Sequence, residues 1–220
     1  PHRQDEWVPP APAACIRVKL VLHLFSGQRR SEDVQHFFEG ATAALDAAAW
    51  MLSVDVANDE VKGDLCKPET ITMFLNLFWT KAVVGFLAGP PCETWSIARW
   101  NILGGGKGPR PLRTQEDPWG LACCTAKEWQ QLDVGNLLLR STITFLYAAL
   151  ATAAFGLMEH PEPRVHDMAA SSFYLVEIRH MVGMAAEGFD VQEANLDQCS
   201  VGSATKKPTR LLLVNFNEVK

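Results

Sequence analysis

Short apolar runs alternate along the chain with segments whose apolar residues recur at every third or fourth position. The apolar runs are nearly continuous and contain β-branched residues, which is typical of buried parallel strands. The recurring segments have the spacing of helices that bury one face. We expect strands at 15–25, 50–56, 81–88, 155–158, 190–195 and 210–215, and helices at 34–48, 68–78, 130–153 and 171–184. Alternating strands and helices predict an α/β fold with a doubly wound, mostly parallel, Rossmann-like sheet.

Two segments break this pattern. Residues 1–14 hold four prolines and several charges, which indicates a flexible arm, so we assign the folded domain to 15–220. Residues 97–129 form an unusually long loop with many glycines and prolines. Four basic residues without an intervening acid lie in this loop: Arg99, Lys107, Arg110 and Arg113. Two interpretations are equally open, a solvated surface loop or a mobile basic flap that contacts phosphates.

Composition narrows the class of protein. Of 220 residues, 48% are hydrophobic and 20% charged, which is typical of one soluble globular domain. The net charge of -5 argues against an overall electrostatic grip on nucleic acid, although it allows a local basic surface. The six cysteines show no C-x-x-C pair and no zinc spacing, so we expect reduced thiols, no metal site and an intracellular protein. No apolar run reaches the roughly 18 residues that span a membrane, so no membrane partner is expected.

Polar or reactive residues follow four of the expected strands. The strand at 81–88 ends in the stiff turn Gly89-Pro90-Pro91, and the next residue is Cys92. The other three strand ends carry Phe25-Ser26-Gly27, Asp55 and Glu159. The carboxyl ends of parallel strands share one edge of a sheet, so these groups are placed to line one crevice. Cys92 is then either a nucleophile or a small buried hydrophobe, and Asp55 either binds ribose hydroxyls or only caps a turn.

Six short motifs follow one another in a fixed order. They are Leu24-Phe25-Ser26-Gly27, Asp55, Gly63-Asp64-Leu65, Gly89-Pro90-Pro91-Cys92 with Trp95-Ser96, Glu159, and Lys206-Lys207-Pro208-Thr209-Arg210. Their order over about residues 17–216 resembles that of the DNA (cytosine-5) methyltransferases, which use S-adenosylmethionine. The resemblance implies a methyltransferase fold and a cofactor site that contains Phe25, Ser26, Gly27, Asp55, Val56, Asp64, Leu65 and Pro91.

The resemblance also implies a reaction on cytosine. Cys92 would add as a thiolate to carbon 6, which makes carbon 5 able to attack the methyl group. Glu159 would donate a proton to ring nitrogen 3 if burial keeps it protonated, and Arg210 would bind the carbonyl oxygen. The base must be flipped out or single-stranded to reach such a pocket. Contacts with DNA, or alternatively RNA, are expected from Ser96, Arg99, Lys107, Arg110, Arg113 and Lys207.

Some positions depart from the family pattern. Gln28-Arg29-Arg30 replace further glycines, and His160 stands where the family has an asparagine that braces the nucleophile loop, so this bracing must come from elsewhere. No target-recognition region is visible, so a recognition domain or partner protein is expected, and the nucleus is the expected location in a eukaryote. The alternatives are a non-catalytic module that binds nucleic acid or cofactor, and an unrelated Rossmann-type enzyme. Trp95 and Trp100 either belong to the core or stack on a base.

Overall fold

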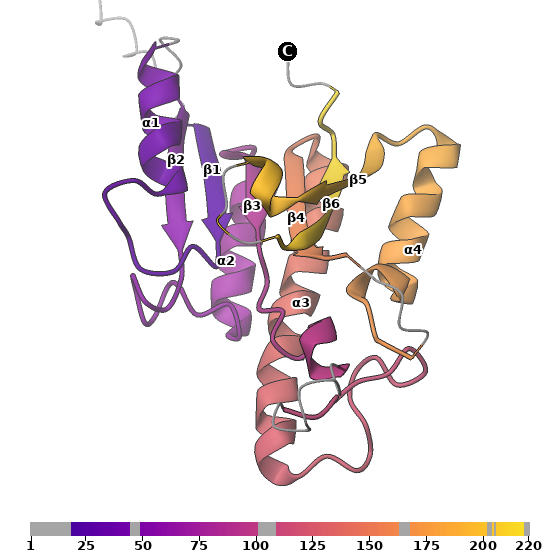
Figure 1. Ribbon diagram of the computed structural model, residues 1–220. Helices are drawn as coiled ribbons and strands as arrows, with labels where there is room; N and C mark the ends of the chain where they lie inside the picture. The colour runs from indigo at the N-terminus through magenta and orange to yellow at the C-terminus, as the bar shows by residue number, and fades with distance from the viewer. Residues whose placement is uncertain are drawn as a thin grey trace, which may run out of the picture.

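The computed structural model describes residues 19–44, 49–100, 109–162, 168–201, 204 and 206–217. The expected arm at 1–14 and Lys107 lie outside these residues. The described chain forms a six-stranded sheet in the order β2-β1-β3-β4-β6-β5 (Figure 1). The strands are β1 (Lys19–Leu24), β2 (Ala49–Val54), β3 (Val83–Ala88), β4 (Phe155–Pro161), β5 (Val191–Asp197) and β6 (Pro208–Val214). The helices are α1 (Val34–Ala44), α2 (Pro68–Trp79), α3 (Ala126–Thr152) and α4 (Val176–Gly183), with 3-10 turns η1 (Ile97–Trp100), η3 (Ser172–Tyr174), η4 (Met184–Glu187) and η5 (Gln198–Val201).

The sheet is parallel on one side and antiparallel on the other. Strand β1 pairs in parallel with β2 and β3, and β3 pairs in parallel with β4. Strand β6 runs antiparallel to both of its neighbours, β4 and β5. The reason is the short connection at 198–207, because a parallel return needs a crossover of about a dozen residues or more. The α/β class is confirmed, and the expected mostly parallel pairing holds for β1 to β4 but not for β6, so the sheet is not doubly wound and parallel throughout.

Helix α1 covers one face of the sheet, while α2 and α3 cover the other. Successive side chains of a strand point to opposite faces. In β2, the Ser53 hydroxyl donates to Gln35 of α1 at 2.8 Å, whereas the adjacent Val54 is buried in the core on the side of α2 and α3. The main hydrophobic core of the protein therefore lies on the face of the sheet that α2 and α3 cover.

Four phenylalanines form the centre of that core. The Phe78 ring stacks on Phe145 of α3 with centroids 5.9 Å apart and meets Phe86 of β3 edge-on at 5.9 Å. Phe74 meets Phe145 edge-on at 6.5 Å. Offset and edge-to-face pairs of this kind add about 0.5–1.5 kcal/mol each beyond the burial of their area. These contacts fix α2 and α3 against β3, whose carboxyl end leads to Cys92.

Helix α3 begins earlier than the hydrophobic pattern predicts. Thr125 caps it, since its hydroxyl accepts the Glu128 amide at 3.4 Å and the Glu128 carboxylate accepts the Thr125 amide at 2.7 Å. The helix ends at Thr152, and the next residue, Ala153, caps it with a left-handed φ of 57°. By length and composition α3 could cross a membrane, but 50% of its most apolar stretch is buried within the fold, which fits a core helix.

The expected helix at 171–184 is interrupted. Ser171 caps the short turn η3 by accepting the Phe173 amide at 3.2 Å. Leu175 then returns to an extended conformation with φ -60° and ψ 142°, and α4 begins at the next residue. Leu175 and Phe173 are both buried, so packing of these two side chains outweighs continuation of the helix.

Candidate functional site

A pocket of about 550 Å³ opens at the carboxyl ends of β1 to β4. Ten residues that the sequence assigns to a site line it: Phe25, Gly27, Asp55, Val56, Asp64, Leu65, Pro91, Cys92, Glu159 and Lys207. The remaining lining residues are Gly63, Cys66, Gly89, Pro90, Glu93, Val134 and Leu138. The structure thus brings together residues from the first to the last of the sequence motifs, as expected for the shared edge of parallel strands.

Asp55 holds the loop after β1 against the loop after β2. Its carboxylate accepts the Gly27 amide at 3.0 Å and the Ala57 amide at 2.9 Å. The Asn58 side chain adds bonds to the Gly27 carbonyl at 2.9 Å and to the Ser26 hydroxyl at 3.1 Å. Gly27 has a φ of 67°, in the left-handed region that favours glycine. An ionised carboxylate accepts about four hydrogen bonds, so Asp55 keeps acceptor capacity for a ligand in the pocket.

The segment from Gly63 to Leu65 forms a second wall. A Cβ at Gly63 would lie 2.1 Å from the Asp55 carbonyl oxygen, so only glycine fits this close approach. Asp64 accepts the Cys66 amide at 3.0 Å and pairs with Lys67 at 3.2 Å. The Leu65 side chain is buried, and its carbonyl accepts the Ser141 hydroxyl of α3 at 3.0 Å. This wall is therefore tied both to β2 and to α3.

Cys92 lies at the other end of the pocket, in the turn that follows Gly89-Pro90-Pro91. Its carbonyl accepts the Trp95 amide at 2.9 Å, which closes the turn. Its side chain is half-buried, and this burial raises the pKa of the thiol above its ordinary value. The Lys207 ammonium acts in the opposite direction, while the Glu159 carboxylate adds to the rise in this pKa. The resting site therefore favours the thiol, and Lys207 is the cation placed to favour the thiolate.

Glu159 is anchored by three donors. Its Oε1 atom accepts from Lys207 Nζ at 3.2 Å, Thr209 Oγ1 at 3.3 Å and Gln198 Nε2 at 3.4 Å. The carboxylate also borders Gly89, where a Cβ would lie 3.4 Å from Oε2. Its side chain is 28% exposed, so the carboxylate is shielded but not sealed from solvent. Lys207, which the sequence analysis assigned to contacts with nucleic acid, lies beside Cys92 and Glu159 in the pocket.

Arg210 does not reach the pocket. Its guanidinium donates to Asn195 at 3.1 Å and to Glu193 at 3.3 Å, and it lies 5.3 Å from the centre of the Phe173 ring. Neighbouring residues of a strand point to opposite faces, and Thr209 is the one that faces Glu159. The sequence analysis missed Thr209, although this alternation within β6 was a signal that could have found it.

Four residues of the described chain that the sequence analysis assigned to nucleic-acid contacts, Ser96, Arg99, Arg110 and Arg113, form hydrogen bonds within the protein. Arg99 donates to the Glu93 carbonyl at 2.7 Å and to the Arg110 carbonyl at 3.1 Å. Arg110 forms a two-pronged bond with Glu128 at 2.9 and 2.7 Å, and the Ser96 hydroxyl accepts the Ala98 amide at 3.2 Å. Arg113 is 1% exposed. The described part of the expected flap is thus folded against α3.

Helix α3 also contributes to the lining of the pocket. Val134 and Leu138 of α3 supply an apolar wall that the sequence analysis missed, although their spacing of four marks one helix face. Trp95 is 5% exposed, which fits a place in the core rather than a base-stacking surface. Among the described residues, no three His, Cys, Asp or Glu side chains are grouped so that they could hold a metal ion.

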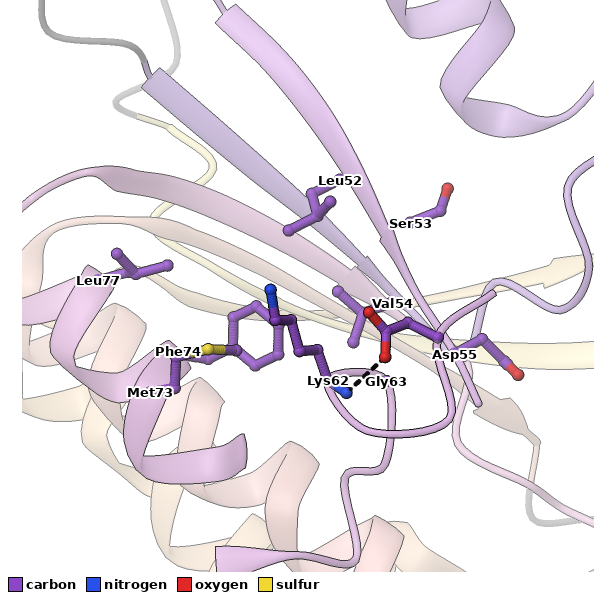
Figure 2. Close-up of a pocket in the computed structure, with 10 residues that line it drawn as sticks. Leu52, Ser53, Val54, Asp55, Lys62, Gly63, Met73, Phe74 and Leu77 are labelled. Carbon is purple, nitrogen blue, oxygen red and sulfur yellow. Dashed lines mark hydrogen bonds between the residues drawn. The ribbon is translucent and has the colours of Figure 1, made fainter. Parts of the chain in front are cut away.

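A second, smaller pocket of about 390 Å³ lies between β2 and α2. Figure 2 shows Leu52 of β2 facing Met73, Phe74 and Leu77 of α2 across it. Asp55 belongs to the lining of both pockets. The lining is mostly apolar. Leu52 is partly exposed on β2, which is the edge strand of the sheet formed by the described residues.

Comparison with known proteins gives structural likeness only. Neither a protein-family model nor a curated protein sequence matches the chain. Among solved structures, the fold is similar to the Dnmt2 methyltransferase of S. pombe, with a TM-score of 0.40 and 11% identity over 90% of this chain and 50% of that one. It is also similar to the methyltransferase EhMeth of Entamoeba histolytica, with a TM-score of 0.42 and 7% identity over 89% of this chain and 52% of that one. The chain spans about half the length of each of these structures.

Proposed function

We propose that this chain transfers a methyl group from S-adenosylmethionine to carbon 5 of cytosine in DNA through a transient covalent bond to Cys92. One observation carries the proposal: a single pocket holds Asp55 and Asp64 together with Cys92 and Glu159. A pocket of about 550 Å³ is within the usual range for a cofactor or small ligand. The order of the sequence motifs supports the same chemistry.

The part of the pocket around Asp55 and Asp64 has the groups that the cofactor needs. Asp55 has acceptor capacity left after binding two backbone amides, which suits the two ribose hydroxyls. Val56, Leu65 and Pro91 give the apolar surface that a flat adenine ring needs, and Asp64 is a nearby acceptor for its amino group. When bound, S-adenosylmethionine supplies an electrophilic methyl group on a positively charged sulfur.

The part of the pocket around Cys92 and Glu159 has the groups that a reaction on cytosine needs. Cys92 forms a bond to carbon 6 of cytosine, and the displaced electron pair moves through the ring while Glu159 delivers a proton to nitrogen 3. Carbon 5 would then take the methyl group, and the sulfur of the cofactor would leave as a neutral thioether with the electron pair of the broken sulfur–carbon bond. Loss of the carbon 5 proton to a solvent base re-forms the ring double bond and expels Cys92 as the thiolate, and nitrogen 3 returns its proton to the Glu159 carboxylate. Lys207 contacts Glu159 and favours the Cys92 thiolate, so it is placed to stabilise charge during addition.

A second candidate function is a cofactor-binding module without turnover. Two observations favour it: burial raises the pKa of Cys92, and the three arginines expected to contact phosphates are bound within the protein. In this case the pocket would bind S-adenosylmethionine, and no nucleic acid would be methylated.

Covalent trapping tests the first proposal. The protein is incubated with S-adenosylmethionine and an oligonucleotide that contains 5-fluorocytosine, because fluorine at carbon 5 blocks release of the cysteine. We expect a denaturation-resistant adduct with DNA that disappears in Cys92→Ala and persists in Cys66→Ala, a half-buried thiol of the same pocket. An adduct with RNA alone would move the activity to RNA. Cofactor binding without any adduct would favour the second candidate, and absence of cofactor binding would exclude both.

Asp55→Ala is expected to weaken binding of S-adenosylmethionine about 10- to 100-fold, since hydrogen bonds to a charged group contribute about 1.5–3 kcal/mol. Asp59→Ala is the matched control, because Asp59 also accepts two backbone amides, those of Val61 and Lys62, both at 2.9 Å, but lines the second pocket. Calorimetric titration measures both affinities. Equal affinities in the two variants would remove Asp55 from the cofactor site.

A further inference from the structure

A buried arginine contacts the loop that carries Cys92. We call residues 92–96 the thiol loop. Arg113 is 1% exposed and donates from Nε to the Thr94 hydroxyl at 3.0 Å. The carbon at the centre of its guanidinium lies 4.2 Å from the centre of the Trp95 ring, a cation–π contact. Thr94 and Trp95 are each 5% exposed, so both contacts lie inside the protein, two and three residues after Cys92.

The same arginine is also hydrogen-bonded to helix α3 and to the segment that precedes it. Its Nη1 atom donates to the Pro118 carbonyl at 2.8 Å and to the Asn136 side chain at 2.7 Å. Asn136 belongs to α3 and also donates to the Trp119 carbonyl at 2.9 Å. Arg113 thus links the thiol loop to a helix of 27 residues whose other end packs in the phenylalanine core.

Trp95 extends this link to the strand that carries Glu159. The His160 ring meets the Trp95 ring edge-on, with centroids 5.7 Å apart and planes at 81°. His160 is 1% exposed, and its Nδ1 atom lies 2.9 Å from the Ser172 hydroxyl. Trp95 therefore lies between Arg113 and His160, so that it couples the position of Cys92 to that of Glu159.

The chemistry of this cluster suits positioning better than stability. The three acceptors of Arg113 are neutral, and burial lowers the pKa of its guanidinium to about 10, which leaves it charged at neutral pH. Within the described residues, its Nη2 atom is buried without a hydrogen-bond partner, as is Trp95 Nε1. A buried cation with incomplete bonding stabilises a fold poorly, but its fork of donors fixes the geometry of the groups it binds.

We propose that Arg113 is a positioning residue that holds the thiol loop, and with it Cys92, in register with Glu159. His160 stands where the resemblance implies an asparagine that braces the loop of the nucleophile. In this chain Arg113 braces that loop instead, through Thr94 and Trp95. The importance of Cys92 rests on the proposed function, but the placement of the loop by Arg113 does not.

The rate of Cys92 alkylation tests this role without requiring methyl transfer. Iodoacetamide modification is followed cysteine by cysteine by mass spectrometry, over a range of pH, in Arg113→Met. We expect release of the loop to expose the thiol, to accelerate its alkylation about tenfold or more, and to move its apparent pKa down towards the ordinary value. Cys66 of the same pocket is the internal reference, and its rate is expected to stay unchanged.

Arg140→Met is the matched control. Its guanidinium also lies 4.2 Å from the centre of a tryptophan ring, that of Trp119, but it does not contact the thiol loop. Thr94→Val removes the acceptor of Arg113 with little change in shape, and we expect the double variant to be no faster than Arg113→Met alone. Arg113→Lys keeps one charged donor and is expected to restore part of the slow rate.

Two results would overturn the proposal: a Cys92 rate in Arg113→Met equal to that of the parent protein, or an equal acceleration of Cys66 and Cys92, which would mean general loosening of the fold. The trapping experiment has an independent outcome. If Arg113→Met accelerates alkylation of Cys92 as expected but the parent protein forms no adduct in the trapping experiment, the cytosine chemistry is refuted and the positioning role of Arg113 is retained.

Discussion

Replacing Glu159 by glutamine is expected to slow methyl transfer about 10²- to 10⁴-fold, which is the usual contribution of a positioned proton donor. Glutamine keeps the length and shape of the side chain, and its oxygen still accepts from Thr209 and Gln198. Its amide has no acidic proton to transfer to nitrogen 3 of the base, so the negative charge that develops there when Cys92 adds is not neutralised. Because Asp55 and Asp64 are unchanged, the affinity for S-adenosylmethionine should stay the same.

Single-turnover rates of methyl transfer, measured with saturating cofactor, provide the readout. Glu93→Gln is the matched control, because Glu93 is an exposed carboxylate that lines the same pocket next to Cys92. A similar loss in both variants would mean that the total charge of the pocket matters, rather than a proton from Glu159. Full activity of Glu159→Gln would exclude Glu159 as the proton donor.

The position of the pocket follows from features that the sequence displays openly. Each apolar run ends close to a polar group, and parallel connections bring successive carboxyl ends to one edge. This rule alone predicts that Asp55, Cys92 and Glu159 lie together, and all three line the pocket. The antiparallel β6 was not anticipated, since its direction depends on the length of the connection at 198–207 rather than on its apolar pattern.

The proposed role of Arg113 could not be predicted from the sequence. A run of basic residues without acids has the composition of a solvated or phosphate-binding surface. The burial of Arg113 depends on acceptors from three separate places, Thr94, Pro118 and Asn136, and no local pattern indicates that they converge. The side-chain directions in β6 were more accessible, because strand alternation alone separates Thr209 from Arg210.

Acidification should destabilise the protein through His160, which is buried between Trp95 and Phe173. Burial, with smaller effects of Lys207 and Arg113, lowers the pKa of His160 to about 3. The unfolded chain has an ordinary histidine pKa of about 6.5 and so binds the proton more strongly between these two values. The free energy of unfolding therefore falls as the pH decreases through this window, by about 2 kcal/mol between pH 7 and pH 5 for this one group.

Urea unfolding at a series of pH values between 7.5 and 5 measures this dependence. His160→Gln is expected to be less stable at pH 7, because an amide is buried in place of the ring, but its stability should decrease less steeply on acidification.

Other titrating groups do not change this comparison. His23, whose pKa burial also lowers, contributes in the same direction in both proteins and so leaves the difference between them unaffected. Asp33 and Glu128, each with a pKa of about 2, lose their stabilising effect only below the unfolded carboxyl pKa of about 4, outside this window. Equal slopes in the parent protein and His160→Gln would mean that His160 takes up its proton in the folded state, which would contradict the sealed cluster that joins Trp95 to the Glu159 strand.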